Sequence, residues 1–285
     1  MYQVKSRCVR PRSLLLAAAL AASMPVQAGA AEPAAAARPG ITPVKVDAAY
    51  KISLNGFELG DFRFKSNVGR TSYTLDTDVQ ISALLGVFHW KGVTQASGAV
   101  AAKAPKPESF RFDFESSVRN GSVTMGFGKE GVEQLSIVPT TSEPADTVPL
   151  TRAHLKNVVD PLSAILALTH SDAPSPCGRK VAIFDGKQRF DIDLRFARKE
   201  PVAGIAGETA IVCRVKYTPI AGYRPNQETQ DLAATNAIEI AFRMVPSAKL
   251  MLPQSVSLPT AAGQARIDLV GVNIEVPAGQ LASAQ

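Results

Sequence analysis

Apolar and polar residues alternate at every second position through most of the chain after its first 45 residues. One such segment, with apolar residues at Tyr50, Ile52 and Leu54, leads into Asn55-Gly56 and a returning segment that ends at Phe64. A period of two is typical of a strand with one buried face, and Asn-Gly is a preferred two-residue hairpin turn. The pattern therefore predicts a β-rich fold that begins with a hairpin.

The same alternation predicts further strands along the chain. They cover residues 71–81, 110–115, 122–127, 131–138, 211–217, 238–244, 250–258 and 267–276. In the second of these, Phe110, Phe112 and Phe114 share one face. Asp113 lies between Phe112 and Phe114, and Glu115 follows Phe114. Because these carboxylates would repel phosphate, we interpret the phenylalanines as core residues rather than as base-stacking residues of an RNA-binding surface.

A second hairpin is expected where Asp185-Gly186 separates two alternating segments, residues 181–184 and 187–196. With a two-residue turn, Phe184 would face Lys187, and Lys180 would face Asp191. The residues expected on the buried face of this hairpin are Val181, Ile183, Phe190, Ile192, Leu194 and Phe196. Those expected to point outward are Asp191, Asp193 and Arg195.

The alternation stops at residues 151–170, where the spacing becomes helical. Asp160 can cap a helix N-terminus, and Pro161 suits its first position. Leu162, Ile165 and Leu166 follow at helical spacing, and the positions between them are also mostly apolar. A short helix that is apolar nearly all round must be covered on several sides.

These elements together predict an all-β protein with one short buried helical segment near 151–170. About a dozen strands in a single sheet are more than an open sheet holds without curling. We therefore expect a strongly curved antiparallel sheet, an incomplete barrel or a β-spiral, with the helix packed in or across it.

The N-terminal residues have the pattern of an export signal. Basic residues at Lys5, Arg7, Arg10 and Arg12 precede an apolar stretch, Leu14–Ala22, and then a zone of small residues. We expect a cleavable secretory signal over residues 1–28 and a flexible Ala/Pro-rich leader over 29–45. A single β-rich domain over 46–278 and a disordered tail over 279–285 complete the expected organisation.

Removal of this signal changes the charge of the chain. The full sequence has 31 Lys and Arg against 25 Asp and Glu, and the signal contains four of the basic residues. The mature chain would retain 27 basic residues and a net charge of about +2, which removes the electrostatic argument for nucleic-acid binding. No apolar run reaches the roughly 18 residues of a spanning helix, so we expect no transmembrane segment in the mature protein.

The cysteine count points to one disulfide bond. Cys8 leaves with the signal, so that only Cys177 and Cys213 remain in a chain sent to an oxidising compartment. A bridge between them would stabilise the fold by about 4 kcal/mol in the chain-entropy model. The alternative is a pair of free thiols; a redox-active pair would more typically have C-x-x-C spacing.

The residues that could perform catalysis form no recognisable motif. His89, His154 and His170 lack the spacing of a zinc site and are interpreted as surface or core histidines. Asp76 and Asp78 share a strand face, which favours a solvated surface over an acid/base pair. We therefore predict no catalytic residues, no metal and no cofactor, while a scattered Ser/His/Asp triad stays open.

A basic cluster surrounds the second hairpin turn, made of Arg179, Lys180, Lys187 and Arg189. These residues are candidates for contact with an anionic envelope component such as a lipid headgroup. The alternative is that they serve solubility and protect an exposed strand edge.

Three segments carry a family resemblance: Val159–Leu166, Cys177–Ile192 and Cys213–Pro225. They resemble a family of uncharacterised exported proteins of Gram-negative bacteria, catalogued only as a domain of unknown function. The resemblance implies a periplasmic β-rich fold with Cys177 and Cys213 bridged, and it brings no catalytic residues. The layout is also distantly similar to the half-barrels of periplasmic lipoprotein carriers, in which a helical plug covers a concave apolar face.

Two functional hypotheses follow. The first is a non-catalytic periplasmic envelope protein whose concave β surface binds an apolar or amphipathic ligand, such as a lipid, or another envelope component. The second is a periplasmic hydrolase with a scattered active site that uses His89, Asp76 or Asp78. The sequence leaves the oligomeric state and the identity of the ligand undetermined.

Overall fold

The computed structural model describes residues 43–83, 86–101, 104–140, 142–170 and 175–277, which all belong to one structural unit. The expected signal over 1–28, nearly all of the leader and the tail over 279–285 lie outside the described residues. These three boundaries stay predictions.

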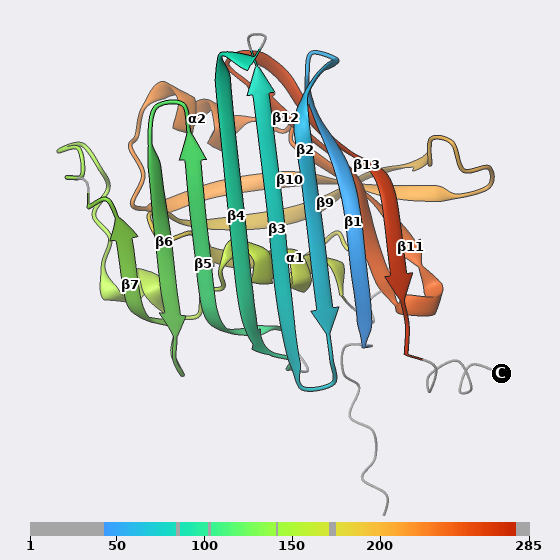
Figure 1. Cartoon of the computed structure of the whole chain (residues 1–285), viewed down its shortest axis with the longest axis horizontal. Coiled ribbons are helices and arrows are strands. Elements are labelled where there is room, and N and C mark those ends of the chain that lie inside the picture. Colours follow the sequence, from blue (N-terminus) through green and yellow to red (C-terminus); the bar gives the residue numbers. More distant parts are fainter. Residues whose placement is uncertain (1–42, 84–85, 102–103, 141, 171–174, 278–285) are drawn as a thin grey trace, which may run out of the picture. The chain divides into compact units, whose positions relative to one another are not determined.

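Thirteen strands of the described residues form one antiparallel sheet (Figure 1). In chain order they are β1 Val44–Leu54, β2 Phe57–Val68, β3 Ser72–Ala83, β4 Phe88–Ala99, β5 Lys106–Ser116, β6 Asn120–Phe127, β7 Val132–Val138, β8 Lys180–Phe184, β9 Arg189–Pro201, β10 Thr209–Ala221, β11 Glu239–Val245, β12 Leu250–Thr260 and β13 Gly263–Glu275. The order across the sheet is β7-β6-β5-β4-β3-β2-β1-β13-β12-β11-β10-β9-β8, so the first strand pairs with the last.

Four short helices interrupt the strands within the described residues. They are the 3-10 helices η2 Arg152–Leu155 and η3 Pro246–Ala248, and the α-helices α1 Pro161–Thr169 and α2 Gln227–Ala234. As expected, the Asp160 side chain caps α1, because its Oδ1 accepts a hydrogen bond from Ser163 N at 2.9 Å. α2 was not predicted: it buries none of its residues, and a helix that is polar on nearly every side leaves no periodic signal.

α1 crosses the inner face of the sheet near one end of the strands (Figure 1). Its N-terminal end meets β3, where Tyr73 Oη lies 2.7 Å from Ser163 Oγ, and its C-terminal end meets β12 through a bridge between His170 and Leu250. The two ends of the strand order, β7 and β8, do not pair with each other in the described part of the chain. The predicted fold class, a curved and incompletely closed antiparallel sheet with a buried helix, is confirmed.

Two apolar clusters fill the inner side and meet at α1. One contains Tyr50, Leu75 and Leu166 and is built mainly on β1 to β6; the other contains Leu194 and Phe242 and is built on β9 to β12. α1 contributes to both clusters. All of its residues are buried except the first one, Ile165 and Ala167. The helix is thus covered by both halves of the sheet, as its apolar circumference requires.

The predicted two-residue turn of the second hairpin is wrong. Phe184 pairs with Arg189 rather than Lys187, and Lys180 pairs with Asp193 rather than Asp191. The reason lies in Asp185. Its Oδ1 accepts hydrogen bonds from the backbone N–H groups of Lys187, at 2.8 Å, and Gln188, at 2.7 Å, and so stabilises a longer turn. The register shifts by two residues, which preserves the assignment of faces.

The exposure of two residues of this hairpin nevertheless differs from the prediction: Asp191 is buried and Phe196 is exposed. Asp191 is only 7% exposed, because Lys180 and Arg189 cover it as ion-pair partners. Phe196 is 59% exposed although its neighbour on the same face, Leu194, is fully buried. The paired length of β8 ends opposite Asp193, so the part of β9 that contains Phe196 lacks a neighbour on that side among the described residues.

β4 was also missed by the alternation. Gly92 and Gly98 provide no side chain at two of its positions, which weakens the alternation of apolar and polar residues. Gly98 is required by close packing, since an added Cβ would lie 2.6 Å from the Tyr73 hydroxyl and 2.8 Å from the backbone of Pro107. Ser97, next to Gly98, lies inside this strand and not at the strand-to-helix turn on which a nucleophilic serine is typically found.

Candidate ligand-binding cavity

A partly enclosed cavity of about 260 Å³ lies between α1 and five consecutive strands of the inner face, β2, β1, β13, β12 and β11. Its wall is almost entirely aliphatic and aromatic, and includes Phe62 and Phe64 of β2, Ile165 of α1, Val256 of β12 and Ile267 of β13. None of the described residues that line it is Asp, Glu, Lys or Arg. The arrangement suits the apolar part of a ligand.

Four lining residues have polar side-chain atoms, and in two of these residues the atom has a hydrogen-bond partner. Tyr50 Oη donates to the Pro253 carbonyl at 3.2 Å, and Thr169 Oγ1 donates to the Ile165 carbonyl at 2.8 Å. The other two, Ser66 Oγ and His170 Nε2, are buried without a hydrogen-bond partner among the described residues. Such orphaned atoms are rare in native proteins, because each one forfeits its hydration without replacement.

His170 is held in its neutral form. The side chain follows the last residue of α1 and is only 9% exposed, and this burial, together with the positive charge of Arg179, lowers its pKa to about 4. Its Nδ1 lies 3.2 Å from Thr169 Oγ1. At neutral pH the cavity wall therefore presents an uncharged imidazole.

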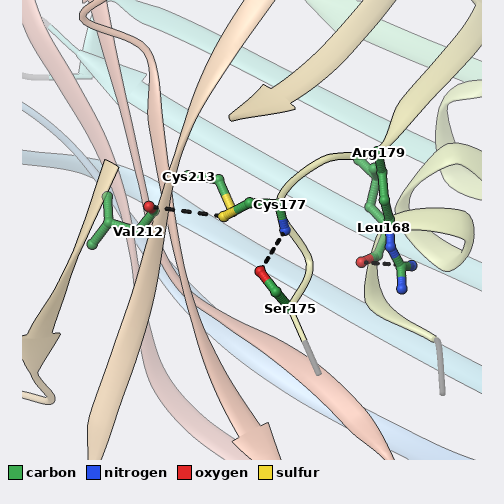
Figure 2. Close-up of a disulfide and its surroundings, with 6 residues drawn as sticks. All are labelled: Leu168, Ser175, Cys177, Arg179, Val212 and Cys213. Carbon is green, nitrogen blue, oxygen red and sulfur yellow. Dashed lines mark hydrogen bonds between the residues drawn. A yellow bond between two sulfur atoms is a disulfide. The ribbon is translucent and has the colours of Figure 1, made fainter. Parts of the chain in front are cut away.

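Arg179 fixes the end of α1 that precedes His170, and Figure 2 shows its contact with the Leu168 carbonyl oxygen, at 3.4 Å. Its Nη1 donates to the carbonyl oxygens of Ala167 at 2.7 Å and His170 at 3.3 Å, which are acceptors left open by the end of the helix. A cation at a helix C-terminus also interacts favourably with the helix dipole. The positions of Arg179 and His170 therefore depend on each other.

The predicted disulfide is present two residues before Arg179 (Figure 2). It joins Cys177 to Cys213, whose Cα atoms are 5.5 Å apart, and Cys213 is fully buried on the apolar side of β10. The bridge attaches the segment that carries Arg179 to the centre of the second apolar cluster. It thereby supports the cavity as well as the fold.

Comparison with known protein families shows to which family the chain belongs. The model of a family described as proteins of unknown function, DUF3108, matches residues 49–270. The chain belongs to the DUF3108 family. The resemblance noted from the sequence, to a β-rich domain of unknown function, is confirmed, and α1, the disulfide and every lining residue of the cavity except Val46 lie within the matched residues.

Two solved structures are similar to this DUF3108 protein. A beta-barrel-like protein of domain of unknown function DUF1849 from Brucella abortus shares 11% sequence identity over 82% of this chain and 99% of that chain, with a TM-score of 0.49. A chain of the Pseudomonas aeruginosa MucA/MucB complex shares 15% identity over 85% of this chain and 56% of that chain, with a TM-score of 0.22. No curated protein matches the sequence.

The four basic residues singled out in the sequence do not converge on one site of the DUF3108 fold. Arg179 caps α1, whereas Lys180 and Arg189 both contact Asp191, at 2.7 and 2.6 Å. Although burial opposes it, hydrogen bonds from these two cations lower the pKa of Asp191. Three of the four cations thus have internal partners, and their contact with an anionic ligand stays a prediction.

The fourth, Lys187, lines a separate cleft of about 430 Å³ next to the N-terminal end of α1. Phe112 and Phe114 form part of its wall, and the Arg119 guanidinium lies 5.7 Å from the centre of the Phe114 ring. The Asp185 carboxylate on this wall already accepts two backbone hydrogen bonds. This cleft is more polar than the cavity, and none of the orphaned buried atoms lies on its wall.

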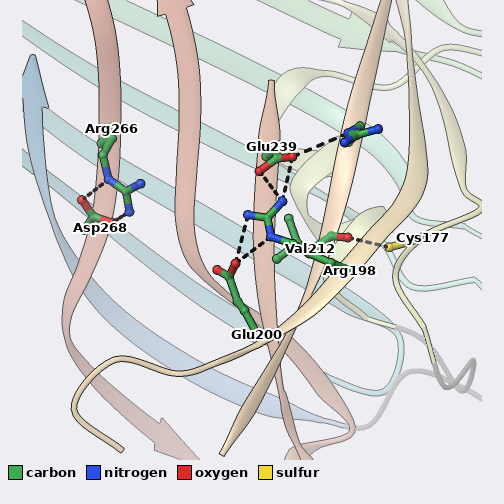
Figure 3. Close-up of polar contacts among 8 residues, drawn as sticks. Cys177, Arg198, Glu200, Val212, Glu239, Arg266 and Asp268 are labelled. Carbon is green, nitrogen blue, oxygen red and sulfur yellow. Dashed lines mark hydrogen bonds and ion pairs between the residues drawn. The ribbon is translucent and has the colours of Figure 1, made fainter. Parts of the chain in front are cut away.

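The outer face of β9, β11 and β13 is charged, in contrast to the apolar wall of the cavity (Figure 3). Arg198 of β9 reaches Glu200 at 2.9 Å and Glu239 of β11 at 2.8 Å, and Arg266 of β13 contacts Asp268 at 2.6 Å. Partly exposed ion pairs of this kind contribute little to stability but keep a sheet face hydrated. Apolar ligands are therefore expected on the inner face only.

The residues considered for catalysis are dispersed. His89 Nδ1 lies 3.1 Å from Ser117 Oγ, Asp76 accepts a hydrogen bond from Gln95, and Asp78 lies 3.8 Å from Lys91. His154 Nδ1 accepts a hydrogen bond from the Thr151 backbone. Within the described ranges, the structure brings none of these histidines to a carboxylate and contains no group of three metal-ligating side chains.

The described residues also include no helix that is both long enough and apolar enough to span a membrane.

The polar atoms that distinguish the cavity, Ser66 Oγ and His170 Nε2, were not singled out by sequence. Ser66 belongs to an ordinary alternating strand, and His170 had been interpreted as a surface or satisfied core histidine. Only the packing of α1 against β12, together with the place of β2 in the sheet, reveals that both atoms lack partners among the described residues.

Proposed function

We propose that this protein is an exported, non-catalytic binding protein that holds the apolar part of an amphipathic envelope molecule in the cavity under α1. The observation that carries the proposal is the combination of an apolar wall with two buried polar atoms that have no partner in the described part of the protein. A cavity that only filled space would be lined without such atoms, since each one costs about 1–3 kcal/mol.

The size of the cavity supports a chain or a single ring as its occupant. An engineered apolar cavity of roughly 150 Å³ holds benzene, and sites for whole drug-sized ligands begin at about 300 Å³. At about 260 Å³, this cavity has room for a medium-length alkyl chain, while a larger molecule would extend beyond it.

Export is supported by two independent features. The N-terminal 28 residues have the basic, apolar and small-residue sequence of a secretory signal. A disulfide between two cysteines 36 positions apart is typical of proteins that fold in an oxidising compartment. An exported binding protein would meet lipids and other amphiphiles of the cell envelope.

Binding is testable with N-phenylnaphthylamine, whose fluorescence increases in apolar surroundings, using protein purified from an export-competent host and freed of lipid. The decisive variant is Val256→Trp, which fills part of the cavity. Its control is Val270→Trp, because Val270 is 60% exposed and belongs to β13 but not to the cavity wall.

We expect the wild type and Val270→Trp to bind the probe with equal affinity, and Val256→Trp to bind at least tenfold more weakly. The melting temperature of Val256→Trp should be maintained, because the new side chain occupies existing space. Absence of saturable binding by the wild type, or equal binding by all three proteins, would contradict the proposal.

A further inference from the structure

The two orphaned polar atoms lie at the same end of the cavity. β1 and β12 run in the same direction because each is antiparallel to β13. Ser66 pairs with Val46 near the start of β1, and His170 bridges to Leu250, the first residue of β12. Both side chains therefore belong to the end of the sheet where α1 crosses it.

The opposite end of the cavity is purely apolar. Ile267 pairs with Ile52 near the end of β1 and with Val256 of β12, and Val256 pairs in turn with Ile240 of β11. Ile240, Val256 and Ile267 all line the cavity. The cavity thus has a polar end and an apolar end, which would orient an amphiphile.

The hydrogen bonds around Thr169 define what the polar end can accept. Thr169 Oγ1 has a single proton, and the short contact of 2.8 Å assigns it to the Ile165 carbonyl. The 3.2 Å contact between Thr169 Oγ1 and His170 Nδ1 is then a hydrogen bond donated by Nδ1. In a neutral imidazole with the proton on Nδ1, Nε2 is an acceptor, so the orphaned atom requires a donor.

Charge restricts the head group further. Arg179, the cation next to His170, is directed at the carbonyl groups of α1 and is not among the residues that line the cavity. With no charged side chain among the lining residues, an ionised carboxylate or phosphate would be buried without a counter-ion, which is strongly unfavourable. A neutral head group avoids this cost.

We propose that the ligand, within the function proposed above, is a neutral single-chain amphiphile with a hydroxyl head group. The hydroxyl donates to His170 Nε2, at the end of the cavity that also contains Ser66, and the chain extends towards Ile240, Val256 and Ile267. A hydroxyl supplies the proton that this acceptor requires and brings no charge into the cavity.

Three ligands of equal chain length test the head group by displacement of N-phenylnaphthylamine near neutral pH. Decanol has a hydroxyl, decyl fluoride is similar in shape but has no donor, and decanoate is charged. We expect decanol to bind about tenfold more tightly than decyl fluoride, and decanoate to bind most weakly, because one buried acceptor is unpaired with the fluoride and one charge is uncompensated with the carboxylate.

The variant His170→Phe identifies the group that distinguishes these ligands. It keeps a ring of similar size and removes the acceptor, so the preference for decanol over decyl fluoride should fall from about tenfold to about onefold. The matched control is His89→Phe, since His89 is exposed on β4 and distant from the cavity wall. In this control the preference should be unchanged.

A measurement on the wild type keeps the proposal testable if His170→Phe does not fold. Nitrogen NMR spectra of the histidine rings should show His170 with a protonated Nδ1 and an unprotonated Nε2. Decanol, but not decyl fluoride, should shift the Nε2 resonance. Assignment follows from the spectrum of a protein in which His89 and His154 are replaced by Gln.

The outcomes separate the two proposals. Equal affinities for decanol and decyl fluoride, or a protonated Nε2, would overturn the hydroxyl head group while leaving the apolar-chain function intact. If none of the three ligands displaced the probe and the probe itself did not bind, the function proposed above would fail as well. Tightest binding of decanoate would point to an anionic ligand and would overturn the neutral head group.

Discussion

The two ends of α1 both bury polar side chains, yet they differ in whether those side chains find partners. At the N-terminal end, Asp160 accepts hydrogen bonds from Ser163 N at 2.9 Å and Ser163 Oγ at 2.5 Å. Because the Ser163 hydroxyl proton is used in this way, the contact of 2.7 Å from Tyr73 Oη is a hydrogen bond donated to Ser163 Oγ. Each buried side-chain group of this network has a partner.

At the C-terminal end, the chain of hydrogen bonds stops at the cavity. Thr169 and His170 Nδ1 are paired, whereas His170 Nε2 and Ser66 Oγ have no partner among the described residues. A satisfied buried network fixes a single packing arrangement, and an unsatisfied one is costly until something binds to it. The comparison teaches that the first end of α1 is structural, and it supports the proposal that the second end is organised for a ligand.

The largest expected effect concerns the anchor of the C-terminal end. Replacing both Cys177 and Cys213 by Ala should lower the free energy of unfolding by about 4 kcal/mol, because the unfolded chain regains the entropy of a loop of this length. Urea denaturation with and without reductant measures it. The wild type should lose stability on reduction and the double variant should not respond; an unchanged wild-type midpoint would show that the bridge has no structural role.

The next effect is a pH dependence specific to the C-terminal end. Because burial lowers the folded-state pKa of His170 from 6.5 to about 4, the unfolded chain binds a proton in this interval and the folded protein does not. His170 should therefore contribute stability that is fully present above pH 6.5 and is lost as the pH falls towards 4, by about 3 kcal/mol.

Other buried groups also have shifted pKa values, so the contribution of His170 is obtained by difference. Burial raises the pKa values of Asp160 and Asp185, which opposes the loss of stability in acid. The free energy of unfolding of the wild type minus that of His170→Gln cancels their effect. This difference should decrease from pH 7 to pH 4; a constant difference would mean that His170 is not buried in its neutral form.

A smaller effect is expected at the N-terminal end. Asp160→Ala should destabilise the protein by about 2 kcal/mol, because the N-cap is lost and the buried Ser163 backbone and hydroxyl donors lose their acceptor. Asp160→Asn retains an oxygen that can accept from Ser163 N and should cost less. Equal losses in the two variants, measured by urea denaturation, would contradict the role of the cap.

The smallest effect compares two buried serines directly. Ser163→Ala should cost about 1–3 kcal/mol, because it removes one hydroxyl from a complete network, whereas Ser66→Ala should stabilise the ligand-free protein by about 1–3 kcal/mol, because it removes a buried hydroxyl that has no partner among the described residues. Thermal unfolding of ligand-free protein measures both. Similar losses in the two variants would show that Ser66 already has a partner and would weaken the assignment of the cavity as a binding site.

Features that depend on local chemistry could be predicted from the sequence. Asp160-Pro161 identified the start of α1 to the residue, because capping and the fixed backbone of proline act within one turn. The disulfide was predicted from the number of cysteines, since only Cys177 and Cys213 remain once the predicted signal is removed. Alternation located twelve of the thirteen strands, and it missed β4 where glycines interrupt the pattern.

Features that depend on distant pairing could not be predicted. The hairpin register was wrong by two residues, because the Asp185 side chain selects a longer turn than Asp-Gly alone implies. The cavity joins Ser66 to His170, more than 100 positions apart, and becomes visible only when α1 is placed across the sheet. The absence of a hydrogen-bond partner has no sequence signature at all.

The most direct test of the account is the position of a bound decanol molecule, measured as intermolecular nuclear Overhauser effects between labelled decanol and the protein. The account predicts contacts between the terminal methyl group of decanol and the methyl groups of Ile240, Val256 and Ile267, and contacts between the carbon that bears the hydroxyl and Thr169. Contacts of decanol with Val270 on the outer face, or a terminal methyl group next to Thr169, would contradict it.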